Sequence, residues 1–260
     1  MKPPERNWVN LNAALEFYGH ANEAAGIVEE GGVKLISSGV ATSVFNIALL
    51  TGPVADVPGE MERRISMAGQ FFRARGTAWS FWVCEDLLAA KLARRLHDVF
   101  DRQGLACIAE SPGMEIDALA EPARGLPRLE MRRVADAETR RHFCDLIAVS
   151  FQIPESIAER VYLPEPPWRE SLAGYVGYAE GEPVSSTALM RTADAVGVYS
   201  VSTRPGRRRR GVAESLMRLC LADFAPGVSP IVLQSSRAGL KLYQMLGCRR
   251  VTRYFIYSSV

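Results

Sequence analysis

The stretch Val198–Leu219, VYSVSTRPGRRRRGVAESLMRL, decides the fold predicted for this chain. A β-type run over 197–203 ends at Arg204-Pro205-Gly206, because proline lacks an N–H donor and glycine tolerates positive φ. Past Gly211, apolar residues recur at helical spacing along one face: Val212, Leu216, Leu219, Cys220 and Phe224. A strand that leads through a glycine loop into a helix presents unpaired N–H groups at the positive end of the helix dipole. The stretch therefore predicts a phosphate-binding turn.

The spacing within this turn is that of a known loop. Arg208-x-x-Gly211-x-Ala213 resembles the acyl-CoA pyrophosphate loop of the GNAT superfamily of N-acetyltransferases, Gln/Arg-x-x-Gly-x-Gly/Ala. Taken alone, the pattern is also compatible with an ordinary strand–helix turn that carries a solvated arginine run.

A second signature follows the buried strand predicted at 231–234. Ser236 to Cys248 resembles the GNAT pattern Asn/Ser-x-x-Ala/Gly-x-x-Leu-Tyr-x-x-Leu-Gly-Phe, with Cys248 where an aromatic residue is usual. Ser236 is the predicted helix cap and Gly247 the predicted C′ glycine. Two signatures in this order make residues from about 127 to 260 similar to a GNAT domain.

The resemblance implies an acetyl-CoA-dependent N-acetyltransferase that uses acetyl-CoA as co-substrate and an amine as acceptor. Direct attack in a ternary complex is favoured, because neither signature holds a cysteine that could carry the acyl group at a catalytic position. The positions that match the family's coenzyme-binding residues are Val201, Ser202, Thr203, Arg208, Arg209, Arg210, Gly211, Val212, Ala213, Ser236 and Gly239.

Two residues receive catalytic roles from the resemblance. The N–H of Val201 is the expected donor to the developing oxyanion, and Tyr243 is the expected general acid for the departing thiolate. The alternative for Tyr243 is a packing role on the buried face of its helix. No general base is identifiable; Glu165 or Glu170 of the proline-rich loop could serve, or could simply be solvated.

The order of predicted elements in the second half occurs already in the first. There, a strand over 43–50, a helix over 59–75, a strand over 77–83, a helix over 87–102 and a further strand follow a helix over 8–29. We therefore predict an α/β fold class with mixed sheets in two tandem GNAT-like acyl-CoA N-acyltransferase domains. The competing explanation is that strand–helix alternation is common in any α/β chain.

The domain boundaries are predicted from a change in composition along the chain. Residues 1–121 form a degenerate GNAT-like domain, 122–127 a linker rich in proline and glycine, and 128–260 the catalytic GNAT domain. The first domain is expected not to bind CoA, because Glu60 and Glu62 stand where a pyrophosphate would lie.

The overall composition excludes several other classes. Hydrophobic residues make up 48% of the 260 residues and charged residues 23%, which is typical of a globular protein. Five cysteines without a C-x-x-C pair favour reduced thiols in the cytoplasm, and three isolated histidines predict no metal site. The N-terminus does not resemble a signal peptide, and no apolar run reaches the roughly 20 residues that span a membrane.

The same properties indicate which partners this protein is expected to bind. A nucleic-acid binder that uses Arg207–Arg210 is the second alternative, but the net charge of +2 and the confinement of the basic residues to one local run argue against it. The first alternative is a non-catalytic acyl-CoA-binding or regulatory module, because no base is evident. A homodimer is a possible assembly, and the sequence leaves the amine acceptor open.

Overall fold

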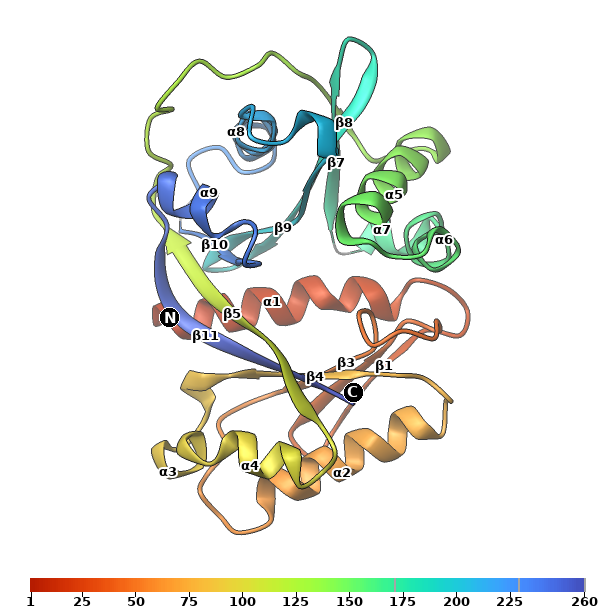
Figure 1. Ribbon diagram of the computed structural model, residues 1–260, viewed down its shortest axis with the longest axis vertical. Coiled ribbons are helices and arrows are strands. Elements are labelled where there is room, and N and C mark those ends of the chain that lie inside the picture. The colour runs from red at the N-terminus through yellow and green to blue at the C-terminus, as the bar shows by residue number, and fades with distance from the viewer. Residues whose placement is uncertain (171, 229, 260) are drawn as a thin grey trace.

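A mixed sheet connects both halves of the chain in the computed structural model, which describes residues 1–170, 172–228 and 230–259 (Figure 1). Within these ranges its strands follow the order β1-β2-β3-β4-β11-β5-β10-β9-β8-β7-β6. The order is not that of the sequence, because the last strand of the chain, β11, lies inside the first half.

The first half alternates strands with helices after one long N-terminal helix. Its elements are α1 (Pro3–Gly19), β1 (Gly26–Glu30), β2 (Val33–Ser37), β3 (Ile47–Leu50), α2 (Glu60–Arg73), β4 (Ser80–Cys84), η1 (Glu85–Leu87), α3 (Ala90–Arg94), α4 (Leu96–Asp101) and β5 (Ala106–Ile116).

The second half repeats the alternation around a longer meander. Its elements are β6 (Glu130–Arg133), α5 (Ala137–Phe151), α6 (Glu155–Tyr162), α7 (Pro166–Glu170), β7 (Ala173–Ala179), β8 (Glu182–Thr192), β9 (Ala195–Thr203), η2 (Pro205–Arg207), α8 (Val212–Phe224), β10 (Ile231–Gln234), α9 (Leu240–Met245) and β11 (Arg249–Ser258). Asp136 caps α5 as its sequence predicts, since its carboxylate accepts a hydrogen bond from the Thr139 N–H at 2.8 Å.

The two halves exchange their final strands. β11 pairs antiparallel with β4, where Tyr254 lies opposite Cys84, and with β5 along almost its whole length. β5 in turn pairs antiparallel with β10, where Met114 lies opposite Leu233. Each half therefore completes its sheet with backbone from the other, and the tandem arrangement predicted from the sequence has an interlocked join.

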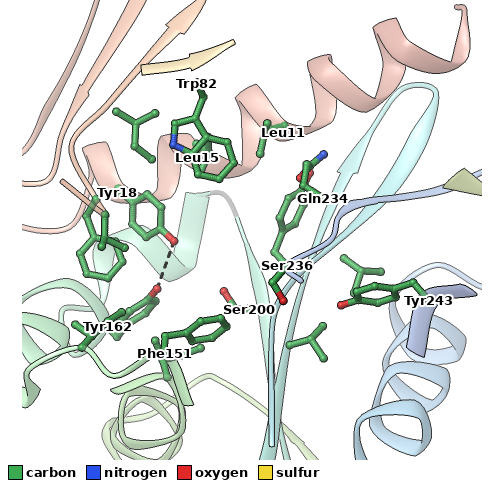
Figure 2. A pocket seen from close by; sticks show the side chains of 18 residues that line it. Leu11, Leu15, Tyr18, Trp82, Phe151, Tyr162, Ser200, Gln234, Ser236 and Tyr243 are labelled. Atoms are coloured by element: carbon green, nitrogen blue, oxygen red, sulfur yellow. Dashed lines mark hydrogen bonds between the residues drawn. The ribbon is translucent and has the colours of Figure 1, made fainter. Parts of the chain in front are cut away.

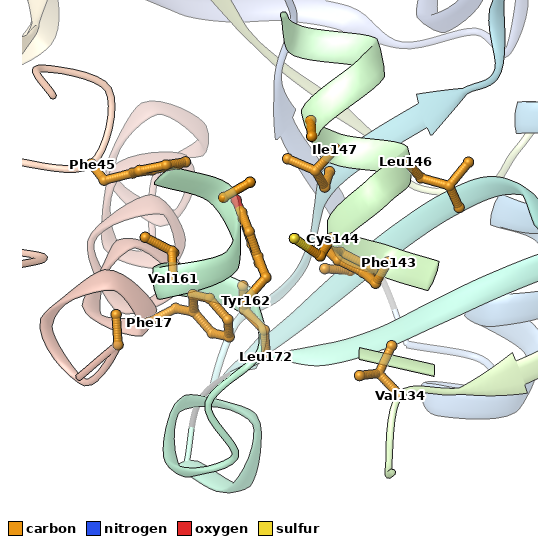
Figure 3. Packing of buried hydrophobic residues seen from close by; sticks show 14 of the residues in the cluster. Phe17, Phe45, Val134, Phe143, Cys144, Leu146, Ile147, Val161, Tyr162 and Leu172 are labelled. Carbon is orange, nitrogen blue, oxygen red and sulfur yellow. The ribbon is translucent and has the colours of Figure 1, made fainter. Parts of the chain in front are cut away.

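Helix α1 lies between the two halves (Figure 1). Its Leu11 and Leu15 pack with the buried residues of β2, β3, β4 and β11. Its Phe17 packs on the opposite side among residues of α5 and α6, including Phe143 and Tyr162 (Figure 3). A helix that is apolar on two sides must be covered on both, so α1 acts as a shared core element.

Asn7 of α1 joins the strands at the boundary. Its side chain is fully buried, and Nδ2 donates to the carbonyl oxygens of Met114 on β5 at 3.0 Å and Leu233 on β10 at 3.3 Å. Its Oδ1 accepts from the Tyr254 hydroxyl and from Gln234 Nε2, each at 2.8 Å. One amide thus satisfies polar groups on three strands where β5 lies between β10 and β11.

Asn10, one helical turn later, makes the corresponding bonds within the second half. Its Nδ2 donates to the carbonyl oxygens of Met190 at 3.2 Å and Ala195 at 3.4 Å, and its Oδ1 accepts from the Tyr199 hydroxyl at 2.7 Å. The helix can come this close only because residue 197 is glycine, since a Cβ there would collide with Asn10 Oδ1.

The helix predicted over 8–29 was wrong at both ends. α1 begins at Pro3 and ends at Gly19, and Gly26–Glu30 forms strand β1 instead. Gly31 and Gly32 both have positive φ, 56° and 79°, and they connect β1 to β2 as a two-residue hairpin rather than simply stopping a helix.

The helix predicted over 87–102 was also wrong, because it is divided into η1, α3 and α4. Leu88 is held in an extended conformation by a parallel bridge to Val54. The carboxylate of Asp86, in η1, accepts a hydrogen bond from the Thr252 hydroxyl of β11 at 2.6 Å. The other predicted elements exist with shifted ends: the strands over 43–50 and 77–83 begin at Ile47 and Ser80.

The hydrogen bonds of Asn7 are expected to stabilise the junction between the two halves. Asn7→Ala should lower the free energy of unfolding by at least about 2 kcal/mol, because several buried polar groups lose their partner together. Asn12→Ala is the matched control, since Asn12 donates only to Trp8 within the same helix, at 3.1 Å. Urea unfolding of both variants measures the difference; equal losses would contradict the joining role of Asn7.

Candidate active site

Strands β9 and β10 separate soon after they meet. They pair in parallel only at Val196 with Ile231 and Gly197 with Val232, although β9 continues to Thr203. A cavity of about 410 Å³ lies where the two strands are no longer paired, and its wall includes residues of β9, β10, α5 and α1. The cavity is the candidate active site (Figure 2).

The cavity wall combines side chains of both halves. From the first half come Leu11, Leu15, Tyr18, Val44, Phe45, Ile47 and Trp82. From the second come Ile147, Phe151, Ile153, Tyr162, Val198, Tyr199, Ser200, Val201, Gln234, Ser236 and Tyr243. The first half therefore helps to build the site even though the sequence signatures all lie in the second.

A bulge in β9 exposes backbone at the cavity. The register with β8 shifts between Ser186–Ser202 and Ala188–Tyr199, so Ser200 and Val201 together face a single residue of β8. Ser200 has a φ of 50°, which is unusual for a residue with a side chain. The bulge therefore includes Val201, the residue whose N–H is the predicted oxyanion donor, and Val201 lines the cavity.

Serines of β8 support the bulge. Ser186 Oγ donates to the Ser200 carbonyl at 2.8 Å, and it lies 2.7 Å from Ser202 Oγ. Ser185 Oγ donates to the Ser202 carbonyl. Both serines are fully buried, so their hydroxyls replace ladder hydrogen bonds that the bulge disrupts. Ser202 itself is buried in this group, and its side chain does not line the cavity.

Tyr243 lies on the opposite wall from α1, with its hydroxyl directed toward the cavity in Figure 2. Burial raises the pKa of this phenol above its usual value of about 10. The hydroxyl is protonated at neutral pH, but the raised pKa also makes it a weaker acid, so donation to a thiolate depends on close positioning. No hydrogen-bond partner for this hydroxyl occurs among the described residues, which leaves it free to face a ligand.

Ser236 lines the same cavity from the loop after β10. Its Oγ accepts a hydrogen bond from the Gly239 N–H at 3.2 Å, although the regular helix α9 begins only at Leu240. The predicted cap therefore acts on the turn that precedes the helix. Gly247, with a φ of 94°, follows the C-cap residue of α9 as predicted.

The loop over 204–211, which we call the arginine loop, leads from β9 into α8 and has the shape of an anion-binding turn. Gly211 is the N-cap of α8 with a φ of 80°, and Val212 and Ala213 begin the helix. Arg208 Nε donates to the Thr203 carbonyl at 3.0 Å, which fixes the loop on the end of β9. Arg209 and Arg210 are exposed to solvent.

The segment predicted as a linker lies against this loop. Arg124 Nη2 donates to the Arg209 carbonyl at 3.2 Å, and the Ser215 hydroxyl donates to the Pro127 carbonyl at 2.8 Å. A Cβ on Gly211 would lie 3.1 Å from Leu126. The guanidinium of Arg124 thus lies beside the N-terminus of α8, together with those of the arginine loop. The sequence signature does not include Arg124.

The structure brings together only part of the predicted set. Val201, Ser236 and Tyr243 share the cavity wall, whereas residues 208–213 lie past the end of β9 and do not line it. The first-half residues Tyr18, Phe45 and Trp82 could not be found from sequence, because they belong to no signature and reach the cavity only through the fold of the two halves.

Neither glutamate considered as a base has a described place in the cavity. Glu165 is bound to Arg169 in an exposed ion pair, and the side chain of Glu170 lies outside the described residues. In the described part of the chain, no cluster of His, Cys, Asp and Glu could hold a metal ion. No helix within the described ranges is long and apolar enough to cross a membrane.

The turn before α2 in the first half corresponds to the arginine loop before α8. Its helix begins in the same way, but the strands beside it, β3 and β4, do not separate. Gly59 is the N-cap of α2 with a φ of 78°, as Gly211 is for α8. However, β3 pairs with β4 from Ile47 to Leu49, and the Val54–Leu88 bridge continues the contact beyond the strands. Hydrogen bonds to Arg64 and Arg63 lower the pKa of Glu60, so this turn carries a carboxylate.

Comparisons with solved structures agree with the two corresponding helix starts, at Gly59 and at Gly211. No family model and no curated protein matches the sequence. A GCN5-related N-acetyltransferase from Kribbella flavida superposes with a TM-score of 0.73 at 16% identity, covering 100% of this chain and 96% of the other. The chain has a tandem GNAT fold.

Two further structures have the GNAT fold at similar distance. A tandem GNAT protein from the clavulanic acid biosynthesis pathway gives a TM-score of 0.55 at 13% identity, with 99% of this chain and 96% of the other covered. A putative GNAT-family acetyltransferase from Novosphingobium aromaticivorans gives 0.56 at 16% identity, with 100% and 97% covered. The tandem GNAT fold therefore extends over the full length, including the first half that lacks both signatures.

The difference between the two halves predicts how many CoA molecules bind. One acetyl-CoA per chain is expected, because β3 and β4 stay bridged and Glu60 would repel a pyrophosphate. Isothermal titration calorimetry measures the number directly. A stoichiometry of two would show that the first half also opens to the coenzyme.

Proposed function

We propose that this tandem GNAT protein is an acetyl-CoA-dependent N-acetyltransferase whose second half holds the coenzyme. The observation that carries the proposal is the separation of β9 from β10, with Val201 of the β9 bulge and Tyr243 both lining the cavity beside them. The arginine loop at the start of α8 lies along the continuation of the same strand, β9.

The residues present fit acetyl-CoA. The first N–H groups of α8 at Gly211–Ala213 would bind the pyrophosphate, and Arg209, Arg210 and Arg124 supply charged donors beside them. Val201–Thr203, at the unpaired edge of β9, would bind the amide-containing arm of the coenzyme. Ser236 and Gly239 border the end of the cavity near Tyr243.

The proposed chemistry is direct transfer. The amine nitrogen attacks the thioester carbonyl carbon, the C–N bond forms, and the Val201 N–H donates to the oxygen as negative charge develops there. The C=O bond then re-forms as the C–S bond breaks, and Tyr243 donates its proton to the leaving sulfur. The new ammonium loses a proton to water, and the Tyr243 phenolate regains a proton from water before the next turnover. Each of these groups lies on the wall of one cavity, which is what holding two reactants in place requires.

The alternative is an acyl-CoA-binding module without turnover. The specific observation in its favour is that the described residues of the cavity wall include no carboxylate and no imidazole to act as a base. Turnover with an amine panel, compared with CoA affinity, separates the two functions.

Gly211→Glu tests the phosphate site. The added carboxylate should weaken acetyl-CoA binding by at least about 100-fold, because it places negative charge at the helix N-terminus. Any side chain at a φ of 80° is strained, so Gly211→Ala is the matched control and should retain most of the affinity. Calorimetry measures both; equal affinities in two folded variants would remove the pyrophosphate assignment.

Tyr243→Phe tests the general acid. Loss of the hydroxyl should lower kcat by about 100-fold or more, with little change in the KM for acetyl-CoA, because the ring and its packing remain. A packing role predicts near-normal kcat in the Phe variant and a lower melting temperature in Tyr243→Ala. Kinetics and thermal melts of both variants decide, and a Phe variant with more than about a third of wild-type kcat would exclude the acid role.

A further inference from the structure

The part of the cavity across from Tyr243 is aromatic. Figure 2 shows Tyr18, Tyr162, Phe151 and Trp82 around it, drawn from α1, α6, α5 and β4. The Tyr18 ring lies 4.8 Å from that of Phe45, and aliphatic side chains of α1 complete the wall. A volume of about 410 Å³ lies at the lower end of the range for small-molecule sites, about 300–1,000 Å³.

Several polar side-chain atoms of this part of the wall are hydrogen-bonded within the protein or lie close to another hydroxyl. The Tyr199 hydroxyl donates to Asn10, Gln234 Nε2 donates to Asn7, and the hydroxyls of Tyr18 and Tyr162 lie 3.4 Å apart. The surface that a ligand meets here is therefore mainly ring faces and aliphatic carbon.

Such a wall opposes a buried positive charge. Burial raises the pKa of Tyr18 and of Tyr162, which shows that this region disfavours the ionised form of these groups. The same loss of hydration would disfavour an ammonium ion, and the described wall offers no carboxylate to pair with it.

The proton balance leads to the same conclusion. An alkylamine with a pKa near 10 is un-ionised to only about one part in a thousand at pH 7, so it needs a base before it can attack. An amino group attached directly to an aromatic ring delocalises its lone pair and is un-ionised at pH 7. It attacks the thioester without prior deprotonation and loses its proton to water only after the C–N bond has formed.

We infer that the acceptor is an amine that is un-ionised at neutral pH and carried on a flat aromatic ring system, an arylamine, which packs against the partly exposed rings of Tyr18, Trp82 and Phe151. This inference rests on the proposed acetyl transfer, and it names the substrate class of that same site. It assigns a binding role to first-half residues that carry neither signature.

A matched pair of amines tests the inference. 2-Naphthylamine and 2-(aminomethyl)naphthalene share a ring system, but only the second is a cation at pH 7. With acetyl-CoA, kcat/KM for the arylamine should exceed that for the aminomethyl compound by at least about tenfold at pH 7. The arylamine value should stay flat between pH 6 and 8.5, while the aminomethyl value should rise with pH.

The other outcomes separate the two proposals. A preference for the aminomethyl compound at pH 7, or acetyl-CoA binding by calorimetry with transfer to neither amine, would overturn the arylamine assignment and leave the coenzyme site standing. Absence of acetyl-CoA binding would overturn the proposed function and the inference with it.

Phe151→Glu locates the acceptor in this cavity. Phe151 is 48% exposed at the end of α5, so a glutamate there is compatible with folding, and it would place a carboxylate beside the acceptor. The ratio of the two kcat/KM values should shift toward the aminomethyl compound by at least about tenfold. Val149→Glu, 54% exposed on the same helix and outside the cavity wall, should leave the ratio unchanged. Equal ratios in both variants would overturn the placement.

Discussion

The amide of Asn7 satisfies backbone carbonyls of β5 and β10 and the hydroxyl of β11 residue Tyr254 at the point where two half-sheets become one. Buried polar groups are costly when unpaired, so this side chain determines where α1 lies and how close the strands can come to it. Glu115 adds a second constraint at the same join. Its buried carboxylate pairs with Arg6 of α1 at 2.9 Å and with Arg249 of β11 at 3.0 Å.

The position of α1 in turn shapes the candidate site. Leu11, Leu15 and Tyr18 of this helix form the wall that faces Tyr243, and Asn10 fixes the ring of Tyr199 on β9. The first half thus contributes to the site although its own strands β3 and β4 do not separate. It supplies much of the apolar surface of the cavity wall.

The sequence was sufficient for the second half because its signals are local. The glycine at the start of α8, the serine before α9 and the glycine after it each depend on conformations that only a few residue types favour. The resemblance to the GNAT family that these residues carry gave Val201, Ser236 and Tyr243 as site residues, and all three line one cavity. The order of predicted strands and helices indicated the repeat, and Glu60 and Glu62 indicated its altered loop.

What the sequence could not show depends on distant contacts. Asn7 lies among the first residues, yet its partners Met114 and Leu233 are more than a hundred positions away. The extended Leu88 breaks a helical pattern only because Val54 pairs with it. The bulge at Ser200 requires the hydroxyls of β8, and the aromatic wall requires α1, β4 and α6 to meet, so neither follows from periodicity within a single segment.

The exchange of β5 and β11 also bears on synthesis by the ribosome. Strand β4 pairs with β3 early, but it cannot acquire its second neighbour until Arg249–Ser258 has been made and has left the exit tunnel. The sheet of the first half therefore keeps an open edge at β4 while the second half is being translated. An exposed edge of this kind invites pairing with other chains, so a newly made molecule depends on rapid completion, or on a chaperone, more than two independent domains would.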